Sequence, residues 1–314
     1  MARMTAGTGA APLDLAAPWG GRSQVADLDG PVHWVDFGGP EGAPAVVLVH
    51  GLGGSHLNWV QIASPLADTY RVRALDLAGF GLTPGHDRST TVHANAELLA
   101  RFLEEVVGAP AILVANSMGG MVALLLASAR PDLVDGLALI SPSLPTERHP
   151  PDRGVALAFL VQATPFVGER VVTNFERRLT DQQRVSRTVN LCFADPTRSD
   201  AGVFDASVAL SAYRRSLQGV DAGYVKAARS LLRVLRGPGR YAALIRGVSK
   251  PVLLIHGEKD RLVPVGAARR AAADNPGWRT VFLPGVGHTP QLEVPDVVLG
   301  HLRTWLADTA PPAK

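Results

Sequence analysis

The sequence has almost no cysteine. Cys192 is the only one among 314 residues, which excludes an internal disulfide framework and any zinc site built on cysteines. Long apolar runs are missing as well, since no stretch approaches the ~18 residues that a membrane-spanning helix requires. Residues 1–22 also lack the apolar segment of a secretion signal. We therefore expect a cytoplasmic protein with no stable membrane insertion.

A large excess of charge of one sign is absent too. The net charge is only +3, whereas nucleic-acid-binding proteins usually gather a stronger basic excess in one stripe. The chain has no G-x-x-x-x-G-K-[ST] phosphate loop. The G-x-G that begins at Gly51 has His56 where a dinucleotide fingerprint needs a third glycine. We expect no nucleic-acid partner, no metal and no organic cofactor.

Short apolar runs alternate with longer helical patterns over most of the chain. Continuous apolar runs are typical of strands buried on both faces, and strand–helix alternation predicts a parallel sheet covered by helices on both sides. The fold class expected is therefore α/β. We expect strands at 31–37, 45–50, 71–76, 111–115, 136–141, 251–256 and 279–284, and helices at 91–107, 118–130, 264–275 and 291–306.

The alternation stops between about residues 145 and 247, where the pattern is helical with few strand signals. We interpret 145–247 as an inserted helical cap, and 1–144 with 248–314 as the two parts of one core domain. The cap carries 16 basic and nine acidic residues, which indicates either an acidic substrate or surface, or simply solvated helix faces paired with the core. Its apolar stretch 154–168 either lines an acyl pocket or packs the cap onto the core.

Ser117 stands between a strand-like and a helix-like run in ILVANSMGGMVALLL (112–126). Gly119 and Gly120 give the helix room to pack close to the sheet, which predicts a tight turn with Ser117 exposed at the carboxyl edge. The alternative is a serine that only caps the helix. HGLGG (50–54) follows another strand, and its glycines either direct backbone N–H groups into a cavity or form an ordinary turn.

Two further polar loops follow strands. HGEKDRLVP (256–264) contains Asp260, and GVGHTPQLEVP (285–295) contains His288. Each is weak alone, because a loop aspartate often caps a turn and a loop histidine is often solvated. Together with Ser117 they give the order Ser…Asp…His, which is the order of the α/β-hydrolase fold.

On these motifs and DLAGFGLT (76–83), the chain from about 24 to 307 resembles the α/β-hydrolase superfamily. Within it, the chain looks like a capped serine hydrolase, similar to carboxylesterases, lipases and meta-cleavage-product hydrolases. The resemblance implies an eight-stranded, mostly parallel sheet with an inserted cap. The usual G-x-S-x-G turn has Ala115 in place of its first glycine, and we expect the turn to survive this small change.

The resemblance also assigns roles. Ser117 would be the nucleophile, which argues against dehalogenases and epoxide hydrolases, since these need an aspartate there. His288 would be the base, because His301 lies inside the last helix, and Asp260 would orient it, with Glu258 as the rival acid. Asp76 is interpreted as a loop organiser. The backbone N–H groups of Leu52 and Met118 would form the oxyanion hole, and the supporting turns would be shaped by His50, Gly51, Gly53 and Gly119.

The predicted function is hydrolysis of a carboxylic ester with a largely apolar acyl group, through an acyl-enzyme intermediate. Carbon–carbon bond hydrolysis of the meta-cleavage type is an alternative, although Thr289 stands where those enzymes often have tryptophan. Lactonase, thioesterase and perhydrolase activities stay open. A binding protein that has lost catalysis is a further alternative, because fold does not fix function.

Overall fold

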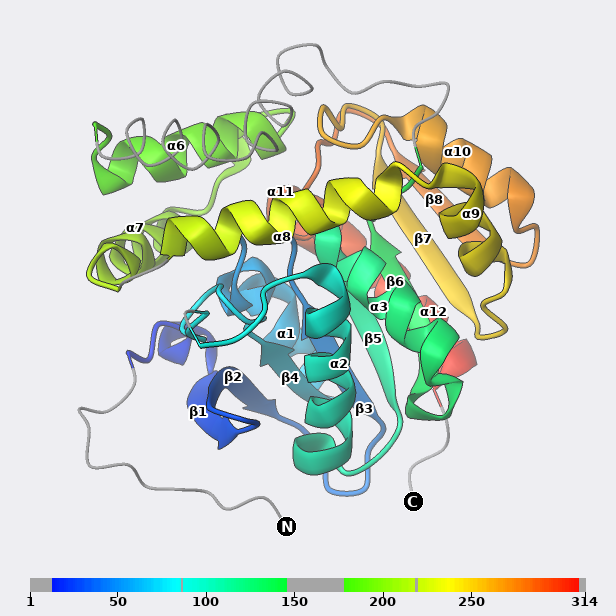
Figure 1. Cartoon of the computed structure of the whole chain (residues 1–314), viewed down its shortest axis with the longest axis horizontal. Coiled ribbons are helices and arrows are strands. Elements are labelled where there is room, and N and C mark those ends of the chain that lie inside the picture. The colour runs from blue at the N-terminus through cyan, green and yellow to red at the C-terminus, as the bar shows by residue number, and fades with distance from the viewer. Residues whose placement is uncertain (1–12, 86, 146–177, 218–219, 311–314) are drawn as a thin grey trace.

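A computed structural model describes residues 13–85, 87–145, 178–217 and 220–310. Its centre is an eight-stranded sheet with the order β1-β2-β4-β3-β5-β6-β7-β8 (Figure 1). β2 pairs antiparallel with β1 and β4, and the other neighbours are parallel. The strands are β1 (Arg22–Asp27), β2 (Pro31–Gly38), β3 (Ala45–Val49), β4 (Arg71–Leu75), β5 (Ala111–Asn116), β6 (Val134–Ile140), β7 (Val252–Gly257) and β8 (Arg279–Leu283).

The central strands are buried on both faces, as their continuous apolar sequences require. In β3, Val46 and Leu48 join the core on one side of the sheet, and Val47 and Val49 join the core on the other. The parallel register pairs Val49 with Ala115. The carboxyl ends of β3 and β5 therefore lie at one edge, and the loops that follow them meet there.

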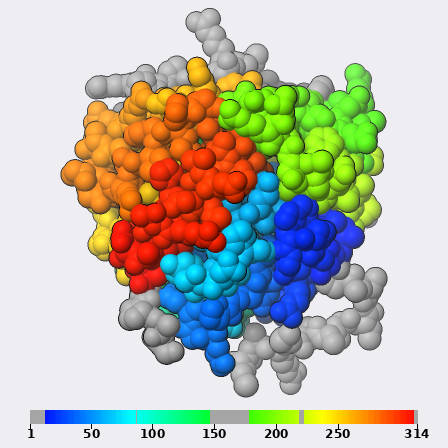
Figure 2. Space-filling view, turned by 180° about the vertical axis from the view of Figure 1, so that it is seen from behind, coloured from blue at the N-terminus to red at the C-terminus, as the bar shows by residue number. Residues whose placement is uncertain are grey.

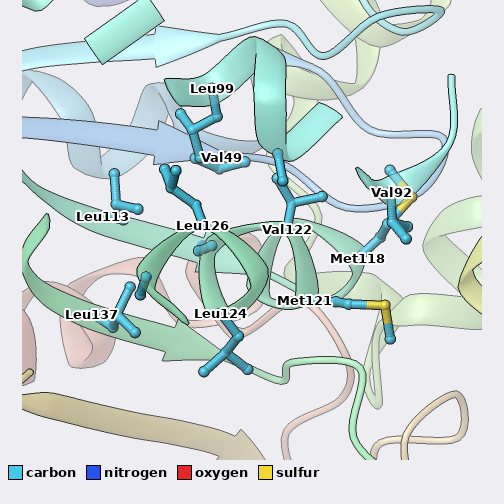
Figure 3. Packing of buried hydrophobic residues seen from close by; sticks show 14 of the residues in the cluster. Val49, Val92, Leu99, Leu113, Met118, Met121, Val122, Leu124, Leu126 and Leu137 are labelled. Atoms are coloured by element: carbon cyan, nitrogen blue, oxygen red, sulfur yellow. The ribbon is translucent and has the colours of Figure 1, made fainter. Parts of the chain in front are cut away.

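Helices cover both faces of the sheet. α2, α3 and α10 pack on one face, and Figure 3 shows Val122 and Leu126 of α3 among the buried residues of that core. α1 and α12 cover the other face and contact each other, as the view from behind shows (Figure 2). The helices outside the cap are α1 (Val60–Ala67), α2 (Val92–Phe102), α3 (Met118–Ala129), α10 (Val265–Asp274), α11 (Pro290–Glu293) and α12 (Pro295–Thr309).

The described part of the cap lies between β6 and β7, and every regular element in it is a helix. These helices are α6 (Asp181–Cys192), α7 (Ala201–Arg215), α8 (Val220–Leu235) and α9 (Pro238–Arg246), with a short 3₁₀ turn at Pro196–Arg198. The apolar stretch 154–168 lies outside the described residues. None of the helices that the structure describes combines the length and apolar character needed to cross a bilayer.

The predicted fold class is confirmed, with differences in detail. The expected helix at 291–306 is two helices, because Pro295 has no N–H to continue α11 and Val294 leaves helical geometry with φ −140° and ψ 61°. The expected helix at 91–107 is α2 followed by a wider π-turn, Leu103–Val107, which ends at Gly108 with φ 72°. The sequence pattern predicts neither β1 nor α1.

Candidate active site

Ser117 forms the apex of a strained turn between β5 and α3. Its φ of 55° and ψ of −118° lie in a region that glycine favours, and its half-buried side chain follows the fully buried Ala115 and Asn116. The turn is held by hydrogen bonds from Ser117 N–H to the Ile140 carbonyl (3.1 Å) and from Ser143 N–H to the Ser117 carbonyl (3.0 Å). The sharp turn therefore forms with alanine in the first glycine position.

Gly119 lets α3 approach the sheet closely. A Cβ atom at this position would lie 2.3 Å from the Val49 carbonyl oxygen and 2.5 Å from that of His50. Any larger residue would push the start of α3 away from β3. The absence of a side chain at Gly119 thus sets where Ser117 stands relative to the loop that follows β3.

That loop, HGLGG, lies directly against Ser117. A Cβ atom on Gly51 would lie 2.9 Å from the Ser117 Cβ, and Gly53 adopts a φ of 75° that favours glycine. The backbone after Gly51 therefore passes beside the hydroxyl. Met118 opens α3, where N–H groups have no partner within the helix. The N–H groups of Leu52 and Met118 thus belong to the two segments that flank Ser117.

His50 braces this loop. Its Nδ1 donates to the Gly51 carbonyl (2.7 Å), while its Nε2 accepts from the Leu77 N–H (3.0 Å), so the geometry selects the neutral ring. Burial lowers the pKa of His50 from 6.5 to about 4, although the nearby Asp76 charge acts in the opposite direction. The ring is therefore a fixed, uncharged support.

Asp260 and His288 form a buried hydrogen-bonded pair. The distance from His288 Nδ1 to Asp260 Oδ2 is 2.7 Å, and both side chains are almost entirely buried. Asp260 Oδ1 accepts from the N–H groups of Leu262 (2.8 Å) and Val263 (2.9 Å), which fix the carboxylate. Burial by itself raises the pKa of Asp260, but the charges and hydrogen bonds around it, those of His288 foremost, lower it below its ordinary value.

This pair leaves the second ring nitrogen of His288 available. An ionised carboxylate only accepts hydrogen bonds, so Nδ1 carries a proton, and in the neutral imidazole the lone pair then lies on Nε2. Asn116, the neighbour of Ser117, ties the histidine loop to the turn, because its Nδ2 donates to the Ile140 (2.9 Å) and His288 (3.2 Å) carbonyls. The structure thus brings the loops of Ser117, Asp260 and His288 together at one edge of the sheet.

Neighbouring titratable groups are engaged elsewhere. Glu258, the rival acid, pairs at the surface with Arg269 (2.6 Å). His256 Nε2 lies 2.8 Å from the Val263 carbonyl and 3.5 Å from Asp260 Oδ2, so this ring packs behind the carboxylate. Only His288, of these two rings, is joined to Asp260 by a short hydrogen bond.

Asp76 collects hydrogen bonds from three directions. Its carboxylate accepts from the His33 ring (2.8 Å), the His56 ring (2.9 Å) and the Leu82 N–H (2.8 Å). Burial alone would raise the pKa of Asp76, but the two imidazoles hold it well below its usual range. Among the described residues, the ligand atoms of His33, His56 and Asp76 lie within 4.8 Å of one another, as a metal site needs. Since Oδ2 already serves both rings and Leu82, we interpret the cluster as an organiser of the loop after β4.

The cap contacts the loops at this edge of the sheet. Arg214 of α7 donates to the carbonyls of Gly79 and Gly81, both at 2.7 Å, and Tyr224 of α8 packs beside Gly53. A surface hollow between α6 and α7 is lined by Val189, Pro196, Phe204 and polar neighbours, and none of the three proposed catalytic residues lines it. The candidate site therefore adjoins the loops that α7 and α8 contact, and it lies apart from this hollow.

Two residues in the site were not assigned a role from the sequence. Asn116 joins the Ser117 turn to the His288 loop. Glu293 accepts hydrogen bonds from the cap and from Gly287. Both lie inside motifs of the sequence, NSMGG and GHTPQLE. Their positions, next to Ser117 and shortly after His288, are the only sequence feature that indicates a role in the site.

Comparison with known proteins identifies the family to which the chain belongs. The α/β hydrolase fold family matches residues 44–295, and the chain belongs to that family. It is 32% identical, over 86% of its length, to the dihydrolipoyllysine-residue acetyltransferase component of the acetoin cleaving system of Cupriavidus necator, but spans only 65% of that protein. It is 30% identical to the magnesium-chelatase 30 kDa subunit of Rhodobacter capsulatus, covering 94% of this chain and 99% of that one. A solved esterase from Thermogutta terrifontis has the same fold, with a TM-score of 0.67 and 22% identity over 93% of this chain and 99% of the esterase.

Proposed function

We propose that this α/β hydrolase cleaves carboxylic esters through an acyl-enzyme intermediate, with Ser117 as nucleophile, His288 as general base and Asp260 as its orienting partner. One observation carries the proposal: the buried 2.7 Å hydrogen bond that directs His288 Nε2 away from Asp260, at the sheet edge where a strained turn presents Ser117. Family membership supports hydrolase activity, and the ester bond is the part that we add.

The chemistry follows from these positions. Ser117 Oγ attacks the ester carbonyl carbon while its proton passes to His288 Nε2, and the carbonyl electrons move onto oxygen. Collapse of this tetrahedral species expels the alcohol, which takes the proton from His288. Water then attacks the acyl-enzyme with His288 as base again, and the carboxylic acid leaves as Ser117 recovers its proton. Asp260 stabilises the imidazolium that forms in each step.

The negative oxygen needs donors that are already in place. The backbone N–H groups of Leu52 and Met118 fit this role, because Gly51 lies against Ser117 and Met118 begins α3. Losing one such donor costs roughly 3 kcal/mol of barrier in comparable enzymes. Both donors are main-chain groups, so the side chain of Leu52 contributes less than the glycines that shape its loop.

The proposed substrate class rests mainly on the helical cap. A helical cap over the sheet edge encloses a site from water, which suits an apolar acyl group. The relatives carry names from three different activities, so similarity alone selects none of them. The esterase among the solved structures shares the fold with this chain and is consistent with ester hydrolysis.

The test is a panel of p-nitrophenyl esters of graded acyl length, measured with wild type and Ser117→Ala. We expect hydrolysis to fall by at least about 10³-fold in the variant, because the nucleophile is lost. A fluorophosphonate probe should label wild type and leave the variant unlabelled. Folded wild type that neither reacts with the probe nor turns over any ester would reject the proposal and favour a binding protein on this fold.

A further inference from the structure

Glu293, at the end of α11, is a buried carboxylate that the proposed reaction does not use. Its side chain is fully buried. One oxygen accepts from the Gly287 N–H at 2.7 Å, and the carboxylate also accepts from the N–H groups of Ala194 (3.1 Å) and Asp195 (3.0 Å). Arg198 also pairs with the carboxylate, at 3.4 Å. A buried carboxylate is costly unless such donors surround it, so its position is strongly defined by these three N–H groups and the guanidinium.

These donors come from two distant parts of the chain. Gly287 immediately precedes His288, whereas Ala194 and Asp195 belong to the cap segment that follows α6. The two segments also bind each other, because the His288 N–H donates to the Cys192 carbonyl at 2.6 Å. A Cβ atom on Gly287 would lie only 2.2 Å from that same carbonyl oxygen, so the backbones are in close contact.

The loop of Asp260 is bound to the same cap segment. Arg261, the next residue, donates from Nη2 to the carbonyls of Leu191 (3.2 Å) and Phe193 (3.3 Å), and also to that of Asn190. One cap segment, residues 190–195, is therefore joined to both loops that carry the hydrogen-bonded pair. Glu293 is the only acidic side chain among these contacts, and it touches the cap and the histidine loop at once.

We infer that Glu293 is a positioning residue, whose carboxylate clamps cap residues 194–195 to Gly287 and thereby aims the His288 imidazole at Ser117. The inference rests on the proposed function, because the orientation of the His288 ring affects the rate only if His288 is the base. If Glu293 has this role, residues 190–195 help to position His288, in addition to any role of the cap in covering the site. A substitution far from the reacting bond that misplaces a catalytic group by about 1 Å can lower the rate about 10²-fold.

The first experiment uses Glu293→Gln in the full-length protein. The amide replaces one accepting oxygen with an NH₂ group, which cannot accept from the N–H groups that face it. We expect kcat for a p-nitrophenyl ester to fall about 10- to 100-fold, with KM within about 3-fold, because substrate binding does not involve Glu293. Asp200→Asn is the matched control: Asp200 also accepts a cap N–H, that of Val203, but caps α7 and does not touch the histidine loop. We expect its kcat within about 2-fold of wild type.

A second readout is independent of substrate. We expect the Nδ1 proton that His288 donates to Asp260 to give a resonance far downfield, and the loss of this resonance in His288→Gln would identify it. We expect Glu293→Gln to broaden or shift this resonance, whereas Asp200→Asn leaves it in place. A purely structural role for Glu293 would lower the unfolding midpoint and change neither the resonance nor the kcat of the folded fraction, and that result would overturn the inference.

Two further comparisons cover the cases in which Glu293→Gln does not fold or wild type is not labelled. If Glu293→Gln does not fold, Glu293→Asp replaces it, since it keeps the carboxylate but withdraws it by one methylene group from the N–H groups of Gly287, Ala194 and Asp195; we expect kcat to fall about 3- to 10-fold. An unchanged kcat and resonance in that variant would also reject the clamp. If wild type labels with fluorophosphonate but Glu293→Gln matches it in kcat, the clamp fails and the proposed function stands. If wild type does not label, the proposed function fails and the resonance alone decides whether Glu293 holds His288.

Discussion

At the scale of single residues, the site separates two carboxylates that lie close in sequence. Asp260 is buried against His288, while Glu258 points to the surface and pairs with Arg269. An asparagine in place of Asp260 must turn either its oxygen or its NH₂ toward the imidazole, and it cannot satisfy His288, Leu262 and Val263 together. The orienting role therefore requires a carboxylate at this position.

We predict that Asp260→Asn lowers kcat for esters by about 10³- to 10⁴-fold, because the imidazole loses the partner that fixes its tautomer. Glu258→Gln should stay within about 2-fold of wild type, since it removes only an exposed ion pair. Steady-state kinetics of both variants on one ester decides between them. A large loss in Glu258→Gln together with near-normal Asp260→Asn would reverse the assignment of the acid.

At the scale of elements, the contact between α3 and β3 depends on Gly119. Helix interiors usually gain stability when glycine becomes alanine, by about 0.5–1 kcal/mol. At Gly119 the added methyl group would meet the Val49 carbonyl at 2.3 Å. Gly300 in α12 offers the opposite environment, because a Cβ there meets nothing within 4 Å.

We predict that Gly119→Ala lowers the free energy of unfolding by at least about 2 kcal/mol, since the start of α3 must move away from the sheet. Gly300→Ala, the matched control, should raise it by about 0.5–1 kcal/mol. Denaturant titrations of the two variants give both values. Equal effects of the two substitutions on the free energy of unfolding would show that the close contact between Gly119 and β3 does not exclude a larger side chain.

The sequence predicts seven of the eight strands to within two residues of their observed ends. These include the buried strands β5 and β7, and also the edge strand β8, in which only Leu283 is buried. All three are rich in β-branched, aromatic or other apolar residues, and this local pattern predicts a strand whether or not the strand is buried. β1 is mostly polar, with only Ala26 buried, so it leaves little pattern to recognise. The helical pattern of α1 is weak as well, since α1 is short and contains Pro65.

The same reasoning explains which site residues could be predicted. Ser117, Asp260 and His288 each stand in a turn-forming motif directly after a strand. The sequence therefore predicts that all three lie at the carboxyl edge of the sheet. Asn116 and Glu293 act through hydrogen bonds to residues 172 and 99 positions away. No local pattern encodes such contacts, because their partners are defined only when the sheet and the cap come together.

At the scale of the whole molecule, buried neutral histidines link folding to pH. The pKa of His50 is lowered to about 4 in the folded protein, so the unfolded chain binds this proton first as the pH falls. The contribution of His50 to stability is therefore complete above about pH 6.5 and is lost progressively toward pH 4. Asp76 and Asp260 contribute to stability in a lower pH range, because folding lowers their pKa values. Their contribution to the free energy of unfolding is present above about pH 4 and is lost as the pH falls further.

We predict that the free energy of unfolding of wild type falls by roughly 3 kcal/mol through His50 alone between pH 6.5 and 4. His50→Gln should be less stable at pH 7 but show a smaller fall over this range, because a glutamine has no proton to gain. Urea titrations at a series of pH values give the two slopes. Identical slopes in both proteins would show that His50 is not the group that titrates.

The order of the chain has a consequence for its synthesis. Ser117 is made with the first part of the core, whereas Asp260 and His288 are made after the cap, from the strands that complete the far edge of the sheet. Domains begin to fold while they emerge from the ribosome. During translation the proposed nucleophile thus exists before its proposed base, so we expect no ester hydrolysis by the nascent chain until β7 and β8 have joined the sheet.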